Sequence, residues 1–164
     1  MPLSQQALVD EFPPELASLV TEMSRGTGQE VRGEAAILNY FRPDDVMCGH
    51  VDKAEEDLTK AIVSISVGQT AIFLLGGETH DEAPVALYIR SGDVVIMGGA
   101  ARTCVHGVPR VIAESIPDFI RDDIQEWESS QEVKEFFLEA RVNINVRQVR
   151  PDGGAPTESP TLSV

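Results

Sequence analysis

The feature that most constrains the fold of this chain is the strict alternation of polar and apolar residues from Arg141 to Arg147. Val142, Ile144 and Val146 occupy every second position, and arginine or asparagine stands at each position between them. Because side chains on a β-strand point alternately to its two faces, this pattern predicts a strand with one aliphatic face packed in a core. The other face carries Arg141, Asn143, Asn145 and Arg147.

A solvated outer face is the simplest explanation of this polar set, but it fits the composition poorly. The chain has a formal net charge of −14, and two of its 13 basic residues stand on this strand. Six strand steps separate the α-carbons of Arg141 and Arg147 by roughly 20 Å, and both side chains can reach inward. The planar guanidinium fork suits carboxylates. The strand therefore predicts a clamp for the two ends of a short dicarboxylate.

Two histidines and one aspartate form a second pattern. On an extended strand His50 and Asp52 share one face, whereas Val51 points away. His106 follows 54 residues after Asp52, far enough to lie on a different strand that closes over the first. Two histidines and a carboxylate with open positions left over are the ligand set of non-haem Fe(II) oxygenases. These residues therefore predict a mononuclear iron site.

A third motif, Asn39-Tyr40-Phe41, precedes the histidine pattern. In the order in which they follow one another along the chain, from Asn39 to Arg147, the three motifs resemble the AlkB family of Fe(II)- and 2-oxoglutarate-dependent dioxygenases. The resemblance covers roughly residues 12–149, and the ordered set is specific, although a lone His-x-Asp would mean almost nothing. Two further stretches, 68–77 and 91–97, are most similar to a mammalian branch of the same family.

This resemblance implies oxidative demethylation of N-methylated adenine in tRNA or DNA. In that reaction Fe(II) and O2 oxidise the methyl group while 2-oxoglutarate is converted to succinate and CO2, and the hydroxylated methyl group leaves as formaldehyde. The expected partner is methylated tRNA or DNA, with no membrane. The expected protein is an intracellular monomer, and the nucleus, cytoplasm and mitochondrion stay open as compartments.

The resemblance also implies roles for single residues. Arg141 matches the arginine that pairs with the distal carboxylate of 2-oxoglutarate, helped by Asn39. Arg147 matches the arginine near the carboxylate that binds iron, and Asn143 matches a supporting amide. The expected iron ligands are His50, Asp52 and His106, and the expected co-substrate residues are Asn39, Phe41, Arg141, Asn143, Asn145 and Arg147.

The chain departs from the bacterial pattern of this family in three places. Phe41 stands where that pattern has a tyrosine, so a hydroxyl near the distal carboxylate is absent, and Tyr40 should point to the other face. Ala54 replaces a second acidic residue close to the substrate base. Only 38 residues precede Asn39, so the N-terminal lid that grips the flipped nucleotide is expected to be mostly absent.

The length of 164 residues predicts one domain. Residues 1–149 are the expected catalytic core, and the polar, turn-rich residues 150–164 are an expected disordered tail. Proline at the first position favours a helix over Pro14–Met23. Many short strands with long returns predict a mainly β fold with flanking helices, a double-stranded β-helix or jelly roll. Strands are expected at Ala35–Phe41, Ala61–Val67, Thr70–Leu75, Val85–Ile89, Asp93–Met97, Val105–Val111 and Arg141–Val149, with a hairpin turn at Arg90-Ser-Gly92.

Half of the excess negative charge lies between Glu114 and Glu139, where nine acidic residues face two basic ones. The spacing of apolar residues over Pro117–Trp127 predicts an acidic helical insertion. Its charges are interpreted as a solvated face, with a partner-docking helix as the alternative. The overall acidity argues against an autonomous nucleic-acid binder, because lysine and arginine contacts to phosphate normally dominate affinity.

Several other residues have simpler interpretations. No apolar run approaches the roughly 18 residues that a membrane-spanning helix needs, and no secretory signal is visible. Cys48 and Cys104 flank the proposed ligands and are expected to be reduced thiols rather than a disulfide or zinc site. His80 is not expected to bind iron, since its loop is polar. The run Glu55-Glu56-Asp57 is expected to be a solvated loop, with a place at the rim of the active site as the alternative.

Two other functions stay open at this point. The chain could be a catalytically weak fragment that acts as a binding or regulatory module. It could also be a dioxygenase with a protein or small-molecule substrate, which would better tolerate the acidic surface.

Overall fold

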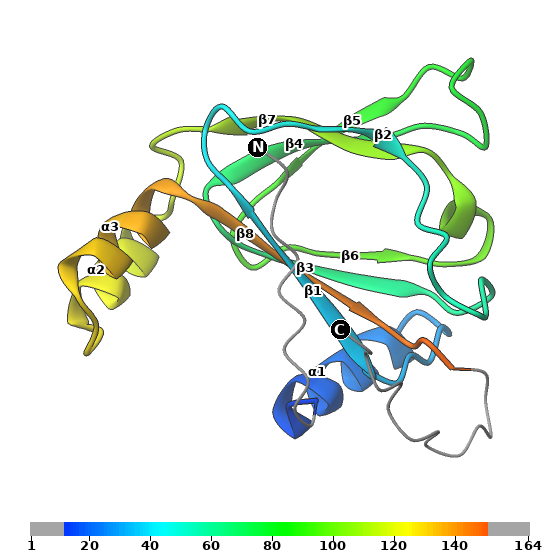
Figure 1. Cartoon of the computed structure of the whole chain (residues 1–164), viewed down its shortest axis with the longest axis horizontal. Helices are drawn as coiled ribbons and strands as arrows, with labels where there is room; N and C mark the ends of the chain where they lie inside the picture. Colours follow the sequence, from blue (N-terminus) through cyan, green and yellow to red (C-terminus); the bar gives the residue numbers. More distant parts are fainter. Residues whose placement is uncertain (1–11, 151–164) are drawn as a thin grey trace, which may run out of the picture.

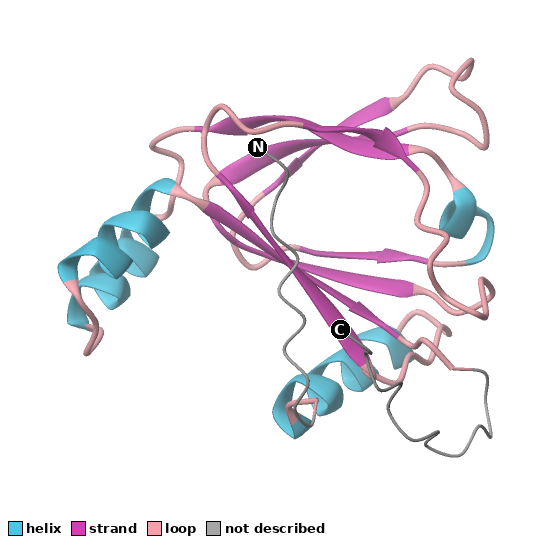
Figure 2. Ribbon diagram, viewed as in Figure 1, coloured by secondary structure: helices cyan, strands magenta, loops and turns pink. Residues whose placement is uncertain are grey.

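Two four-stranded sheets lie face to face, with helices outside them, in the computed structural model, which describes residues 12–150 (Figures 1 and 2). No helix in this described part is long and apolar enough to cross a membrane. The elements are α1 (Pro14–Arg25), β1 (Ala35–Phe41), β2 (Met47–His50), β3 (Ile62–Gly68), β4 (Thr70–Leu75), β5 (Val85–Ile89), β6 (Val94–Met97), the 3-10 helix η1 (Gly99–Thr103), β7 (His106–Ile112), α2 (Asp118–Glu126), α3 (Gln131–Glu139) and β8 (Arg141–Arg147).

The strand order confirms the predicted jelly roll. One sheet has the order β1-β8-β3-β6 and the other β2-β7-β4-β5, with every neighbouring pair antiparallel. The expected strands are present to within two residues at each end. The aliphatic face of β8 packs against α1 through Val146, and its polar face turns toward the other sheet. The alternation over 141–147 therefore gave the two faces of this strand correctly.

The predicted hairpin at Arg90-Ser-Gly92 is wrong. The turn exists, since the amide of Asp93 donates to the carbonyl of Arg90 at 3.0 Å. However, β5 pairs with β4 and β6 pairs with β3, so the turn carries the chain from one sheet to the other. The amide of Gly92, at φ 89°, donates to the carbonyl of Ser66 in β3, which directs the chain into the second sheet.

A second crossover, between β3 and β4, depends on Gly68. This residue has φ 89°, and an added Cβ would collide with the carbonyl oxygen of Ala140. Only glycine satisfies both conditions. The two crossovers close the sheets over each other, and the main core lies between them, formed by Phe41, Ala71, Phe73, Ile89, Met97, Val108 and Val111.

The acidic segment forms two helices, α2 and α3. Between α2 and α3 the chain turns, and the Ser130 hydroxyl accepts a hydrogen bond from the amide of Val133 at the start of α3. The pair projects from one side of the sandwich (Figure 1). Most of its acidic side chains are exposed, as predicted. The expected tail over 150–164 lies outside the described residues, apart from Arg150.

Candidate metal and organic acid site

The three predicted ligands meet at one end of β2 and β7. β2 ends at His50, β7 begins at His106, and the two histidines are direct partners in the antiparallel register. Asp52 lies two residues beyond β2. The expectation that His106 comes from a strand closing over the first is therefore wrong, because it comes from the neighbouring strand of the same sheet. In the described part of the chain, His50, Asp52 and His106 form one group whose candidate ligand atoms all lie within 4.8 Å of one another.

The aspartate faces both imidazole rings. Its Oδ1 lies 3.8 Å from Nε2 of His50, and its Oδ2 lies 3.7 Å from Nε2 of His106. Oδ2 is buried and has no hydrogen-bond partner within the described residues. An ionised buried oxygen without a partner is costly, so it indicates a site completed by a cation. The mixed nitrogen and oxygen donor set fits a divalent transition metal such as iron.

Each histidine is oriented by the backbone of the cysteine two residues before it. Nδ1 of His50 lies 3.0 Å from the carbonyl oxygen of Cys48, and Nδ1 of His106 lies 3.1 Å from that of Cys104. Since a carbonyl only accepts, Nδ1 carries the proton and Nε2 keeps its lone pair for a metal. Burial lowers the pKa of His106, which favours the neutral, metal-binding form.

The inner face of the other sheet supplies the polar wall of the site. β8 lies between β1 and β3, and strand alternation places Asn39 of β1 and Ser64 and Ser66 of β3 on the same side of the sheet as the polar face of β8. A cavity of about 140 Å³ lies between this wall and His106. This volume suits a small organic acid better than a drug-sized ligand. All nine predicted site residues line it: Asn39, Phe41, His50, Asp52, His106, Arg141, Asn143, Asn145 and Arg147.

Arg141 is a buried cation with unused donors. The residue is 3% exposed, and among the described residues only its Nη2 is bound, to the hydroxyl of Ser66 at 3.0 Å. Nε and Nη1 have no partner within the described part of the chain. Its guanidinium lies 5.1 Å from the ring centroid of Phe41. Burial lowers the pKa of Arg141 to about 10, so it is still charged at neutral pH. This arrangement is typical of a site for an anionic group.

The asparagines hold the wall together instead of pointing freely into the cavity. Asn143 donates to the hydroxyl of Ser64 at 2.6 Å and accepts from the Asn39 amide at 3.3 Å. Asn145 accepts from Nε of Arg147 at 3.3 Å. Tyr40 points to the opposite face, as the alternation predicts, and its ring contacts Phe136 of α3 at 5.8 Å.

Arg147 differs from its expected role as the second half of an open clamp. Its Nη2 pairs with Oδ1 of Asp52 at 2.9 Å, and its Nη1 pairs with the carboxylate of Glu55. Glu55 was expected in a solvated loop, but only 8% of the whole residue and 2% of its side chain are exposed. Burial alone would raise the pKa of Glu55, but its ion pairs with Arg147 and Arg102 lower it overall. The segment is a loop, and Glu56 is exposed as expected, but the solvated interpretation is wrong for Glu55, which pairs with a residue that lines the cavity.

Sequence reasoning missed Arg102, which is 1% exposed. Its guanidinium binds Glu55 at 2.6 Å and the backbone carbonyls of Lys60 and Asp52 at 2.8 Å each. The only sequence signal was one arginine among small residues in Gly98-Gly-Ala-Ala-Arg102. The lone cation has no local acidic partner in that stretch, so the sequence alone did not identify its role.

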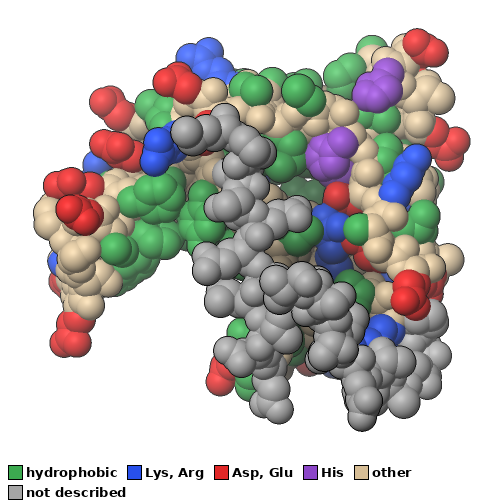
Figure 3. Space-filling model, in the orientation of Figure 1, with side chains coloured by type: hydrophobic (Ala, Val, Ile, Leu, Met, Phe, Trp, Pro, Cys, Tyr) green, Lys and Arg blue, Asp and Glu red, His purple; other side chains and the backbone are tan. Residues whose placement is uncertain are grey.

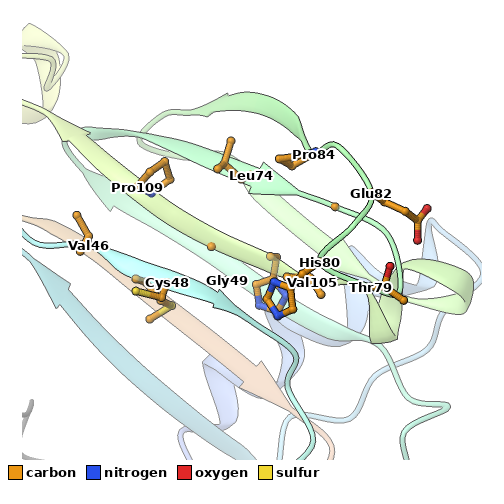
Figure 4. A pocket seen from close by; sticks show the side chains of 14 residues that line it. Val46, Cys48, Gly49, Leu74, Thr79, His80, Glu82, Pro84, Val105 and Pro109 are labelled. Atoms are coloured by element: carbon orange, nitrogen blue, oxygen red, sulfur yellow. The ribbon is translucent and has the colours of Figure 1, made fainter.

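A second, larger cavity of about 420 Å³ lies on the outer side of the strands that carry the histidines (Figure 4). Leu74 lines it, whereas the adjacent Phe73 lines the smaller cavity, so the two cavities lie on opposite faces of β4. His80 belongs to the loop over this outer cavity and is not part of the metal-ligand group among the described residues.

Figure 3 shows histidine and basic side chains together in the hollow between the sheets.

Comparison with known proteins shows which superfamily this chain belongs to. Residues 4–147 match the 2OG-Fe(II) oxygenase superfamily. Among curated proteins, the chain is 46% identical over 140 residues to "DNA N(6)-methyladenine demethylase ALKBH1A" of Arabidopsis thaliana, a match that covers 82% of this chain and 40% of the relative. It is 39% identical to "tRNA demethylase abh1" of Schizosaccharomyces pombe, covering 85% and 45%, respectively.

A human relative, "Nucleic acid dioxygenase ALKBH1", is 41% identical over 155 residues, covering 84% of this chain and 40% of the relative. The chain thus spans less than half the length of these three relatives. The solved structure of OsALKBH1 superimposes with a TM-score of 0.70 at 22% identity, covering 84% of this chain and 66% of that one. This likeness supports the same fold.

Proposed function

Because this chain belongs to the AlkB family within the 2OG-Fe(II) oxygenase superfamily, we propose that it is an Fe(II)- and 2-oxoglutarate-dependent dioxygenase core. It demethylates N-methylated adenine in tRNA or DNA, and it releases formaldehyde, succinate and CO2. One observation carries the proposal. Asp52, whose Oδ2 lies near two imidazole nitrogens, and Arg141 line the same cavity, and neither this oxygen nor Nε and Nη1 of Arg141 has a partner among residues 12–150.

The two halves of this cavity have different tasks. His50, Asp52 and His106 would hold Fe(II), which with 2-oxoglutarate supplies the chemistry that oxidises the methyl group. Arg141 binds the distal carboxylate of 2-oxoglutarate with Nε and Nη1, which have no partner in the described part of the chain. The Phe41 ring covers one side of this arginine. The buried surroundings strengthen the ion pair, because charges attract more strongly where water is excluded.

The open side of the site lies at His50. Its side chain is 38% exposed, whereas that of His106 is 8% exposed. A nucleobase would therefore approach along His50 and the loop that follows β2. This loop carries the exposed Ala54, which leaves space where the bacterial pattern has an acidic side chain.

Phe41→Tyr tests whether a lost hydroxyl limits co-substrate binding. Phe41 is 3% exposed and lies beside the free donors of Arg141. A tyrosine hydroxyl there should add one hydrogen bond to the distal carboxylate. The binding free energy of 2-oxoglutarate should improve by about 0.5–1.5 kcal/mol, which lowers its Kd roughly 2- to 12-fold. Isothermal titration with 2-oxoglutarate, with Mn(II) in place of iron, measures the Kd of the variant and of the wild-type chain. Weaker binding would mean that the pocket has repacked around the phenylalanine.

The substrate class is tested by comparing methylated adenine in a loop with the same base in a duplex. A base must leave its stack to reach a buried site, and unstacking costs a few kcal/mol that protein contacts must offset. With a net charge of −14, this chain can make few phosphate contacts. We expect formaldehyde release to be faster from the looped substrate. We also expect affinity to fall about tenfold between about 50 and 200 mM salt, the slope for about two phosphate contacts.

Equal rates on loop and duplex, with little salt dependence, would contradict this account of substrate binding. Turnover of 2-oxoglutarate that no nucleic acid stimulates would instead indicate a protein or small-molecule substrate. Binding of methylated RNA without any formaldehyde would indicate a binding module.

We also propose a monomeric, intracellular enzyme. All the proposed ligands and anion-binding groups come from one chain. Cys48 and Cys104 are both free thiols, as expected in a reducing compartment.

A further inference from the structure

One oxygen of the Asp52 carboxylate is already engaged by the protein. Oδ1 accepts from Nη2 of Arg147 at 2.9 Å, whereas Oδ2 is buried and has no partner in the described part of the chain. A carboxylate can bind a metal through one oxygen or through both. With Oδ1 held by a guanidinium, Oδ2 alone is available to a metal.

Arg147 cannot easily leave this position, because its other nitrogens are bound as well. Nη1 pairs with Oε1 of Glu55, and Nε donates to the side chain of Asn145 at 3.3 Å. Arg147 also stands within β8, where pairing with β1 and β3 on both sides fixes its backbone. Its orientation therefore depends on Glu55.

Glu55 is in turn held by Arg102. Nη2 of Arg102 binds Oε2 of Glu55 at 2.6 Å, and Nη1 donates to the backbone carbonyl of Asp52 at 2.8 Å. The contacts therefore close a ring. It runs from the Asp52 carboxylate through Arg147, Glu55 and Arg102 back to the backbone of Asp52, and we call it the Asp52 ring.

The Asp52 ring contains two carboxylates and two guanidinium groups, so its formal charges balance. The side chains of Arg102, Glu55 and Arg147 are 1%, 2% and 8% exposed. Removing one partner would leave a buried charge without compensation, which is strongly unfavourable. Because the ring begins at the carboxylate of Asp52 and ends at its backbone, it fixes the direction of the carboxylate relative to its own main chain.

We propose that Glu55 and Arg102 are positioning residues that hold Asp52 as a ligand through one oxygen. This inference rests on the metal centre proposed above. A carboxylate that bound through both oxygens would occupy one of the open positions that the co-substrate needs. Neither residue lines the cavity with the ligands, so both act through Arg147 and the backbone of Asp52.

Cobalt(II) binding to the full chain tests the proposal, because the visible spectrum of Co(II) reports its coordination. Glu55→Gln keeps the shape but replaces one acceptor oxygen with an NH2 group, which must face one of the two guanidinium groups. Arg102→Met removes the ring's contact with the Asp52 backbone. For both variants we expect Co(II) affinity to fall roughly 10- to 100-fold, the usual cost of losing an outer-shell partner, together with a changed spectrum.

Glu56→Gln is the matched control, since Glu56 is the exposed neighbour of Glu55. Wild-type affinity and spectrum in both folded ring variants would overturn the proposal, as would an equal effect of Glu56→Gln. If the single variants do not fold, the double variant Glu55→Met with Arg102→Met carries the test, because it removes one charge of each sign. An unchanged Co(II) spectrum in the double variant would also overturn it.

The wild-type chain separates the failure of this proposal from the failure of the proposed function on which it rests. A wild-type chain that binds one Co(II), together with unaffected ring variants, would refute the role of the ring alone. A wild-type chain that binds no Co(II) would refute the metal centre itself. Thermal unfolding of the metal-free proteins separates a general loss of stability from a change at the metal.

Discussion

Replacing Asp52 with alanine is expected to abolish tight Fe(II) binding. Asp52 supplies the only carboxylate in the ligand group, and two histidines alone do not define the three-ligand face that this type of site requires. The affinity for Fe(II) or Co(II) should fall by more than about 100-fold, beyond the cost of losing an outer-shell group. Anaerobic isothermal titration measures the effect, and 2-oxoglutarate turnover should be lost with it.

Two histidine variants supply a second test of the ligand assignment and a control. His106→Ala should behave like Asp52→Ala, because its Nε2 faces the same carboxylate at 3.7 Å. His80→Ala should leave the metal content unchanged, since its side chain lies over the outer cavity. Full iron occupancy and turnover in Asp52→Ala would mean that the ligand assignment is wrong.

Replacing Arg141 with lysine is expected to raise the KM for 2-oxoglutarate strongly while leaving metal binding intact. Lysine keeps the positive charge but offers a single ammonium group in place of the guanidinium fork. Arg141 uses Nη2 on Ser66, and its Nε and Nη1 have no partner among the described residues, so a single ammonium at this place cannot both bind Ser66 and present two parallel donors to a carboxylate. Losing one charge-assisted hydrogen bond costs about 1.5–3 kcal/mol, roughly a 10- to 160-fold rise in KM.

The measurement is the 2-oxoglutarate dependence of succinate formation, with Co(II) affinity determined in parallel. Arg110→Lys, at an exposed arginine, is the matched control. An unchanged KM in Arg141→Lys would show that the distal carboxylate binds elsewhere. A loss of Co(II) binding would show that Arg141 supports the metal ligands, a role that the structure gives to Arg147 through its 2.9 Å contact with Asp52.

Local patterns in the sequence predicted the elements and the faces of the strands. The alternation over 141–147 gave both the strand and the direction of its arginines, because the two-residue period of a strand is a local property. The same logic placed Tyr40 and Phe41 on opposite faces of β1. The placement of all nine predicted site residues around one cavity needed the ordered motifs as well, since no single histidine or arginine identifies such a site.

The tertiary structure decided which strands pair. Arg90-Ser-Gly92 has the composition of a hairpin turn, yet β5 and β6 belong to different sheets. A turn determines only that the chain reverses or changes direction. Pairing depends on the contacts that each strand makes with β4 or β3, which come from other parts of the chain.

The sequence by itself determined the donor chemistry of this protein, that is, two imidazoles, one carboxylate and two arginines in a fixed order. Only the tertiary structure decided how those groups are used. Glu55 lies 47 residues from Arg102 and 92 from Arg147, and these separations concealed a buried ion-pair ring that appeared in the sequence as a solvated loop. Burial and charge pairing are properties of the folded sheets, so a short acidic run cannot reveal them.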